Sequence, residues 1–213
     1  MKKTKHFNFM DIDFFLLSAT LICAIFGMIM ISSAVKTMDG GNRLLIIQGI
    51  SAVIGVSLML FIASVDYEFW SKLTPVIYGG CVFLLVLVLI IGTGKEDVGS
   101  KSWIRFGSIG IQPSEIVKIG FILTFSKSVS KIGDEINKPK NILKLMLHLG
   151  VLLGLILLQP DFGTAMVFIS IFAGIMFVSG ISWKYIVAAA VFISAAIPFV
   201  WNFVLKEYQK GRI

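Results

Sequence analysis

The acidic residue in the stretch LLQPDFGTAM, residues 157–166, stands between two long apolar segments. Asp161 follows Pro160, which ends a helix, and directly precedes an apolar run, so it occupies the N-cap position of the next helix. One interpretation is therefore a cap, which stabilises a helix by about 1 kcal/mol. The other is a carboxylate that takes a proton from a reacting hydroxyl, as a general base does. This stretch by itself favours the cap and leaves both roles open.

A second polar stretch, QPSE at residues 112–115, has the pattern of a helix start. Pro113 suits the first helical position, where its missing N–H costs nothing, and Glu115 in the first turn meets the positive end of the helix. Glu115 and Lys118 share a helix face, so we expect them to form an ion pair. That pair could fix helix packing or contact a ligand.

Basic residues gather just before this helix start. The segment GTGKEDVGSKSWIRFGSIGIQ, residues 92–112, carries Lys95, Lys101 and Arg105 and interleaves them with Trp103 and other apolar side chains. One interpretation is a connector that Trp103 anchors at the membrane surface. The other is a segment that lies in the interface and binds an anionic ligand with its basic residues.

Three further residues of chemically versatile types are assigned to packing. His148 has no second ionisable group at helical spacing on its face, so we expect a hydrogen-bonded packing residue rather than a proton relay. Cys23 and Cys81 both fall inside apolar runs, where cysteine behaves as a small hydrophobic residue. We expect neither a disulfide nor a metal site from them.

The composition defines the environment that must position these residues. The chain has 213 residues, of which 57% are hydrophobic and 15% charged, and its mean hydropathy is +0.92. Such values are typical of a membrane protein rather than of a soluble domain. The net charge of +7 does not indicate nucleic acid binding, because the basic residues sit in short segments between apolar runs, where lipid headgroups are the expected anionic partner.

The apolar runs predict an all-α integral membrane protein, a polytopic helix bundle with seven spans in a single transmembrane domain over residues 1–213. About 20 helical residues cross the hydrocarbon layer, because backbone polar groups cannot be left unpaired in lipid. The fourth run is the least apolar of the set. The expected spans are Phe14 to Val35, Leu44 to Ser64, Leu73 to Gly92, Pro113 to Val129, Ile142 to Leu158, Phe162 to Val178 and Tyr185 to Val204.

The lysines of the short loops predict the orientation. Cytoplasmic loops carry an excess of Lys and Arg, and both the N-terminal MKKTKH and the loop at residues 130–141 are rich in lysine. We therefore expect a cytoplasmic N-terminus, a cytoplasmic basic loop at 130–141 and an extracytoplasmic motif loop at 93–112. The basic residues of the outer loop then go against the rule, which again points to an anionic ligand.

Three stretches together resemble one family. GSKSWIRFGSIGIQPSEIVK, QPDFGTAMVF and the closing KEYQKGRI are similar, in this order and at about this separation, to the SEDS family of bacterial cell-wall proteins, the RodA, FtsW and SpoVE type. The stretch DYEFWSKLTPVIYGG looks more like the RodA branch. The family fold has about ten spans, each an apolar helix of about 20 residues. The resemblance therefore implies that this chain is the N-terminal portion of a SEDS protein.

The resemblance also implies an activity. Family members are multi-pass proteins of the bacterial plasma membrane that polymerise the lipid-linked disaccharide lipid II into peptidoglycan during elongation, division or sporulation, and so control cell shape. They work with a class B penicillin-binding protein. The implied reaction is an inverting glycosyl transfer in which Asp161 is the catalytic base.

The resemblance places further residues at the substrate. The implied substrate-binding residues are Lys101, Trp103, Arg105, Gln112, Ser114, Glu115, Lys118 and Gln159. Lys101, Arg105 or a bound divalent metal ion could neutralise the departing pyrophosphate. The family commonly has a basic residue just before the tryptophan, where this chain has Ser102.

Two alternatives to the enzyme remain open. A lipid II transporter would move the headgroup across the bilayer, but it should show internal repeats and interrupted helices near mid-membrane. Here the polar motifs all gather toward one face, which favours the enzyme. A non-catalytic scaffold that recruits a partner through its helices is the other alternative, and it follows from the expected missing helices.

Overall fold

The computed structural model describes residues 13–36, 41–94, 100–106 and 109–199, and this part of the chain is almost entirely helical. It contains seven α-helices, a short 3₁₀ helix and a two-stranded hairpin, which confirms the predicted all-α membrane class. The helices are α1 (Phe14–Ala34), α2 (Gly41–Ser64), α3 (Tyr67–Ile91), α5 (Pro113–Ile132), α6 (Pro139–Leu158), α7 (Phe162–Val178) and α8 (Trp183–Phe199), with η2 (Gly133–Asn137) between α5 and α6.

Each predicted span corresponds to one of these helices. Four helical stretches are long and apolar enough to cross a membrane, namely α1, α2, Glu68–Ile91 of α3 and α6. The apolar stretches of α7 and α8 are shorter, and α5 carries four charged residues. Multiple crossings are therefore confirmed, whereas the count of seven crossings stays a prediction. The last five residues of the predicted seventh span, Lys95 and the KEYQKGRI motif lie outside the described residues.

Several of these helices begin at a capping residue or a proline. Asp13 caps α1 by accepting a hydrogen bond from the Leu16 backbone N–H at 3.0 Å. Pro113 and Pro139 stand at the starts of α5 and α6, where a proline loses no backbone hydrogen bond. The predicted helix start at QPSE is thereby confirmed.

The chain separates into two compact units, residues Met1–Trp70 and Ser71–Ile213. In the first unit α1 and α2 form a helical hairpin whose apolar side chains remain largely exposed. Gly41 at the start of α2 packs against the backbone of Val35, so that no side chain would fit there. Exposed apolar surface on both helices suits contact with lipid tails.

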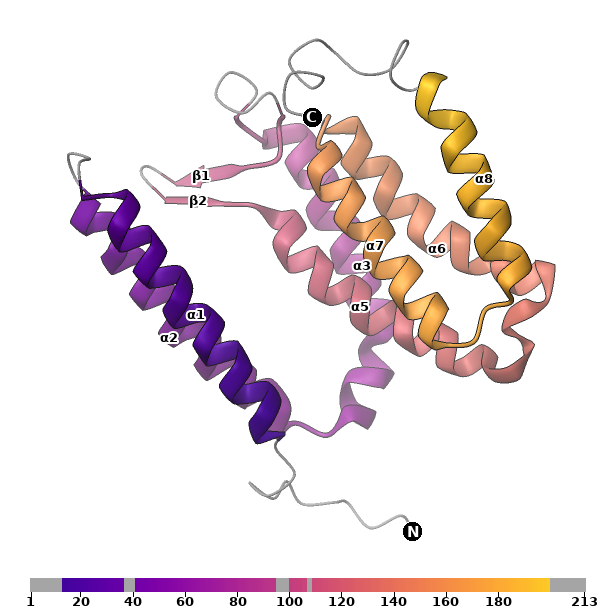
Figure 1. Ribbon diagram of the computed structural model, residues 1–213, viewed down its shortest axis with the longest axis horizontal. Helices are drawn as coiled ribbons and strands as arrows, with labels where there is room; N and C mark the ends of the chain where they lie inside the picture. Colours follow the sequence, from indigo (N-terminus) through magenta and orange to yellow (C-terminus); the bar gives the residue numbers. More distant parts are fainter. Residues whose placement is uncertain (1–12, 37–40, 95–99, 107–108, 200–213) are drawn as a thin grey trace. The chain divides into compact units, whose positions relative to one another are not determined.

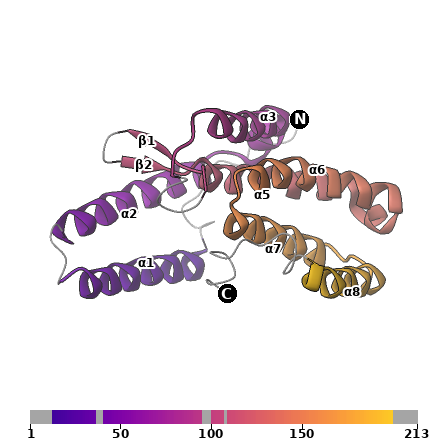
Figure 2. The same cartoon turned by 90° about the horizontal axis from the view of Figure 1, so that it is seen from above.

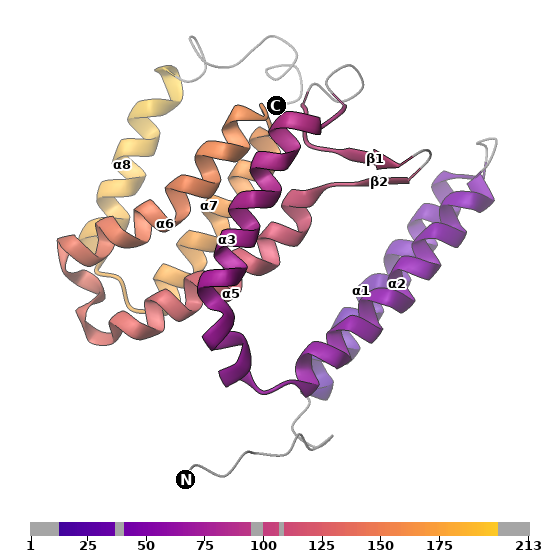
Figure 3. The ribbon, with the colours of Figure 1, turned by 180° about the vertical axis from the view of Figure 1, so that it is seen from behind.

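In the second unit α5, α6 and α7 pack against one another and form its core. Phenylalanines from α5 and α7 meet there, with ring centroids 5.3 Å apart for Phe121 and Phe168 and 5.0 Å apart for Phe125 and Phe172. Figures 2 and 3 show α3 beside α5 and α6, on the side away from α7. Gly120 of α5 lies directly against the Cys81 thiol of α3, so the close approach of these helices depends on a missing side chain.

His148 lies inside this unit between α3, α5 and α6. Its ring nitrogens are within hydrogen-bond distance of the hydroxyls of Thr124, at 3.1 Å, and Ser128, at 3.3 Å. Tyr78 packs on the ring with centroids 4.3 Å apart and donates to the His148 carbonyl at 2.9 Å. The predicted role of a hydrogen-bonded packing residue is confirmed.

The segment between α3 and α5 contains a hairpin that the sequence patterns did not predict. Strands β1 (Ile104–Phe106) and β2 (Ile109–Ile111) pair antiparallel, and Thr93 and Trp103 form a further backbone bridge. The Trp103 ring covers Gly110, where an added Cβ would lie 3.1 Å from it. The motif loop is thus held as a folded extension at one end of the second unit (Figure 1).

Candidate functional site

Asp161 is the N-cap of α7, as its position after Pro160 predicted. Helix α6 ends at Leu158, and the chain turns at residues 159–160 before α7 begins at Phe162. One carboxylate oxygen of Asp161, Oδ1, accepts the backbone N–H of Thr164 at 3.1 Å. This bond satisfies a helix N–H that would otherwise have no partner.

The other carboxylate oxygen connects α7 with α5. Oδ2 of Asp161 accepts from the side-chain amide of Gln112 at 3.0 Å and from the Thr164 hydroxyl at 2.9 Å. The Gln112 amide also lies 3.4 Å from that hydroxyl. Gln112 and Asp161 are 49 residues apart in the chain, so tertiary packing brings the two predicted site residues together.

Sequence reasoning missed Thr164. Its signal was its place three residues after an N-cap acid, where a side chain faces back toward the cap. Thr164 is buried, whereas Asp161 is partly exposed. Three donors hold the carboxylate in one orientation, and a carboxylate has about four acceptor positions, so about one position remains for a further hydroxyl.

The remaining residues of the QPSE stretch lie in the first turn of α5. Ser114 is buried, and its hydroxyl has no hydrogen-bond partner among the described residues. Glu115 and Lys118 form the predicted ion pair, with Nζ and Oε2 2.8 Å apart. The Lys118 side chain is 23% exposed and that of Glu115 57%, so the lysine is the more enclosed partner.

Gln159 lies in the turn before Asp161 but faces another way. Its side chain is buried and donates to the backbone carbonyl of Leu85 at 3.3 Å. It therefore ties the end of α6 to α3, and this bond gives it a structural task. Its implied contact with substrate stays a prediction.

The described part of the motif loop carries two basic residues at its surface. Lys101 and Arg105 are exposed, and Trp103 is half-buried in the hairpin. Ser102, which stands where the family commonly has a basic residue, is buried, and its hydroxyl is 2.8 Å from that of Ser100. Ser102 therefore has a structural role inside the loop, through its contact with Ser100.

The described residues do not fit a resident metal ion. They contain no cluster of three His, Cys, Asp or Glu side chains that could hold one. Asp161 brings a single carboxylate whose oxygens already accept three hydrogen bonds.

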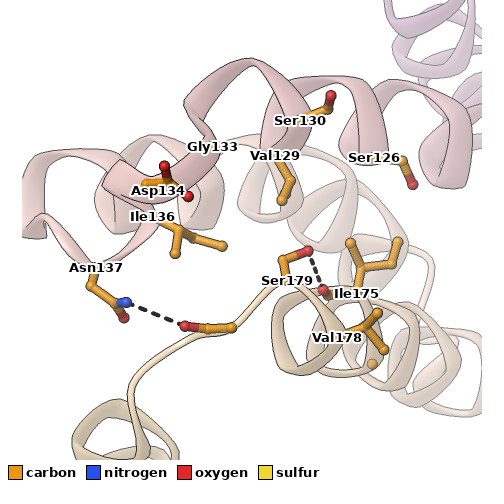
Figure 4. A pocket seen from close by; sticks show the side chains of 12 residues that line it. Ser126, Val129, Ser130, Gly133, Asp134, Ile136, Asn137, Ile175, Val178 and Ser179 are labelled. Carbon is orange, nitrogen blue, oxygen red and sulfur yellow. Dashed lines mark hydrogen bonds between the residues drawn. The ribbon is translucent and has the colours of Figure 1, made fainter.

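A cavity of about 780 Å³ lies at the opposite end of the second unit, between α5, η2 and the end of α7 (Figure 4). Asn137 donates to the Gly180 carbonyl beside it at 3.2 Å and accepts from the Ser182 N–H at 2.6 Å. None of the predicted site residues lines this cavity. The cavity is therefore separate from the group formed by Gln112, Asp161 and Thr164.

The fold and the site define a multi-pass helical membrane protein with a fixed carboxylate at the start of one helix. The family model of the FtsW, RodA and SpoVE cell cycle proteins matches residues 13–213. The chain belongs to this family, as the resemblance of its motifs predicted.

Relatives from all three branches of the family match the chain. It is 31% identical over 210 residues to a "Probable peptidoglycan glycosyltransferase FtsW" of Geobacter metallireducens, covering 95% of this chain and 55% of the relative. It is 38% identical over 183 residues to "Stage V sporulation protein E" of Bacillus subtilis, covering 79% and 48%. The "Peptidoglycan glycosyltransferase RodA" of Treponema pallidum is 31% identical over 209 residues, with 93% and 47% covered. The chain spans about half the length of these relatives, and its assignment to the RodA branch stays a prediction.

Solved structures share the fold. A chain from "Structural coordination of polymerization and crosslinking by a peptidoglycan synthase complex" superposes with a TM-score of 0.78 at 26% identity, covering 95% of this chain and 58% of that one. The Thermus thermophilus "Rod shape determining protein RodA" superposes with a TM-score of 0.72 at 26% identity, covering 88% and 60%.

Proposed function

We propose that this chain carries the catalytic base of a peptidoglycan glycosyltransferase that polymerises lipid II at the bacterial plasma membrane. The observation that carries the proposal is the Asp161 carboxylate, held by Gln112 and Thr164 at the junction of α5 and α7 with about one acceptor position left. The printed names of the FtsW and RodA relatives support the reaction class.

In the proposed reaction Asp161 accepts the proton of a sugar hydroxyl of one lipid-linked substrate. The oxygen attacks the anomeric carbon of the second substrate, the new C–O bond forms with inversion, and the bond to the lipid pyrophosphate breaks. The proton then leaves Asp161 for water. Gln112 and Thr164 keep the carboxylate aimed during this step, and orientation of this kind lowers the barrier.

The leaving pyrophosphate needs positive charge close to it. Lys101 and Arg105 are exposed on the hairpin segment between α3 and α5, in the same connection that ends with Gln112. Lys118, in the second turn of α5, is paired with Glu115 and so offers hydrogen-bond donors rather than net positive charge. We assign the binding of the anionic part of the substrate to this basic segment, with Trp103 and Ser114 beside it.

The proposed orientation puts the N-terminus in the cytoplasm and the Asp161 end of the second unit outside. This orientation places the base where lipid-linked wall precursors are used. A class B penicillin-binding protein is the proposed partner, supported by the peptidoglycan synthase complex among the similar structures.

Replacing Asp161 with asparagine tests the proposal. Asparagine still caps a helix but is not basic, so Asp161→Asn should abolish polymerisation of lipid II while the chain still folds in detergent. Loss of the charged acceptor for Gln112 and Thr164 should lower the free energy of unfolding by no more than about 3 kcal/mol. Asp13→Asn is the matched control, because Asp13 caps α1 in the same way. The assay follows glycan chain length on gels, for the chain itself and for the chain co-expressed with the unmatched remainder of a longer relative.

Polymerisation that persists in Asp161→Asn would refute the assignment of the base. An absence of activity in every wild-type preparation, with or without the remainder, would instead favour a non-catalytic scaffold.

A further inference from the structure

A groove of about 520 Å³ lies between the second half of α5 and the first half of α6. This region is at the opposite end of these helices from Gln112 and Asp161, so the proposed reaction does not use it. The polar side chains that line the groove are Ser128, Lys131, Glu135, Asn141, Lys144 and His148.

Two ammonium groups give this groove its charge. Lys131 lies in the last turn of α5 and Lys144 in the second turn of α6, so two helices contribute one lysine each. Both side chains are exposed, and within the part of the chain that the structure describes neither has an ion-pair partner. Two unpaired cations on one groove attract an anion.

The acidic residue of the groove is already neutralised by another lysine. Lys138 donates to the Glu135 carboxylate at 2.6 Å. This hydrogen bond and the positive charge of Lys138 lower the pKa of Glu135, so the carboxylate stays ionised and paired. With Glu135 and Lys138 cancelling, Lys131 and Lys144 leave the groove a net charge of about two positive units.

The polarity of the groove changes along its length. Ile132 and Leu145 add apolar wall, and His148, which is one helical turn beyond Lys144, has its ring nitrogens facing the hydroxyls of Thr124 and Ser128. Among the described residues, the end of the groove at His148 therefore has no charged side chain that would bind a second anionic group. This arrangement fits a ligand that has one anionic group, bound at the lysines, and an apolar part that lies along the helices.

The groove also lies close to the ends of both helices, where we expect lipid headgroups. Helix α5 ends at Ile132 and α6 begins at Pro139, so the lysines stand within about a turn and a half of the point where the chain leaves the helices. The neighbouring surface of α6 exposes Leu143, Met146 and Leu147, which suit acyl chains. Basic pockets between membrane helices are common binding sites for anionic lipid headgroups.

We propose that this groove is a binding site for an anionic phospholipid, whose phosphodiester contacts Lys131 of α5 and Lys144 of α6. The bound lipid bridges the two helices that also carry the packing around His148. The site is independent of Asp161 and of the proposed glycosyl transfer.

Native mass spectrometry of the full chain with phosphatidylglycerol tests the site. The purified 213-residue chain in neutral detergent is titrated with phosphatidylglycerol or phosphatidylcholine, and the fraction that retains one lipid is measured. The wild-type chain should retain phosphatidylglycerol in preference to phosphatidylcholine. Lys131→Gln with Lys144→Gln should weaken its retention about thirty-fold, since each lysine near a lipid phosphate contributes about a factor of five.

The matched control is Lys127→Gln with Lys140→Gln, which removes the same charge from α5 and α6 outside the groove. The control should change retention less than about three-fold, and Lys131→Arg with Lys144→Arg should preserve it. The proposal would be overturned if the two double glutamine variants lost phosphatidylglycerol retention equally. It would also be overturned if the wild type retained both lipids equally. Competition by millimolar inorganic phosphate would also overturn it, because a free anion would then fill the site.

Discussion

The two oxygens of the Asp161 carboxylate have different partners, which bears on both its structural role and its proposed chemical role. Oδ1 caps α7, and Oδ2 receives the side chains of Gln112 and Thr164. The cap and the general base, which the sequence left as alternatives, are therefore compatible in one residue. A cap fixes the carboxylate at a helix start, and this position gives it the constant orientation that a base requires.

Thr164 is expected to hold this carboxylate in place. Thr164→Val removes a donor from a charged acceptor in a buried position, so the free energy of unfolding should fall by about 1.5–3 kcal/mol. In preparations that polymerise lipid II, the rate of polymerisation should fall as well. Without the Thr164 hydroxyl, Gln112 is the one described side chain that still donates to Oδ2 of Asp161. Thermal unfolding and the gel assay measure the two effects.

The control for this experiment is Thr164→Ser, which keeps the hydroxyl and should preserve polymerisation. A rate in Thr164→Val equal to that of the wild type would contradict a positioning role.

Besides the shared apolar core, specific contacts join α3 to α5 and α6 in the second unit. Gly120 admits the Cys81 thiol between α5 and α3, and Gln159 ties the end of α6 to the Leu85 carbonyl. Pro113, Pro139 and the N-cap Asp161 mark where α5, α6 and α7 begin. The hairpin between α3 and α5 was not predicted because its strands have three residues each, too few for an alternating pattern to indicate a strand.

Gly120→Ala should destabilise the contact between α3 and α5. The new Cβ would collide with the Cys81 sulfur, and overpacking of a core typically costs about 1–3 kcal/mol. Thermal unfolding in detergent would report the loss. Combining Gly120→Ala with Cys81→Ala should restore much of the stability, because the smaller side chain makes room.

Gly150→Ala serves as the matched control in α6. Nothing lies within 4 Å of a Cβ at that position, so stability should be unchanged or slightly raised. An equal loss in Gly150→Ala and Gly120→Ala would show that the contact with Cys81 does not matter.

The polar features of the second unit are segregated to its two ends. The hairpin β1–β2 lies at one end of this unit, and the connection between α5 and α6 lies at the other (Figures 1 and 3). Gln112 and Asp161 stand at the hairpin end of α5 and α7, and the groove with Lys131 and Lys144 stands at the other end of α5. Loops at opposite ends of membrane helices face opposite sides of the bilayer. The proposed orientation therefore assigns the Asp161 end to the outside and the groove to the cytoplasm.

Cysteine labelling in intact cells tests this orientation. In a background that carries Cys23→Ala and Cys81→Ala, Lys101→Cys should react with a membrane-impermeant maleimide, whereas Asp134→Cys should react after lysis. Both positions are exposed, so protection reports the side of the membrane. The reverse pattern would contradict a cytoplasmic N-terminus.

The sequence by itself determined the membrane environment, the starts of the helices, the cap at Asp161 and the Glu115–Lys118 pair. These features depend on composition or on residues within one turn of each other, which a linear pattern records. Tertiary structure decided which residues meet at Asp161, because Gln112 reaches it across 49 residues through the packing of α5 on α7. It also turned Gln159 toward Leu85, buried Ser102 and brought Lys131 and Lys144 to one groove. These outcomes depend on how helices pack, which short-range patterns do not encode.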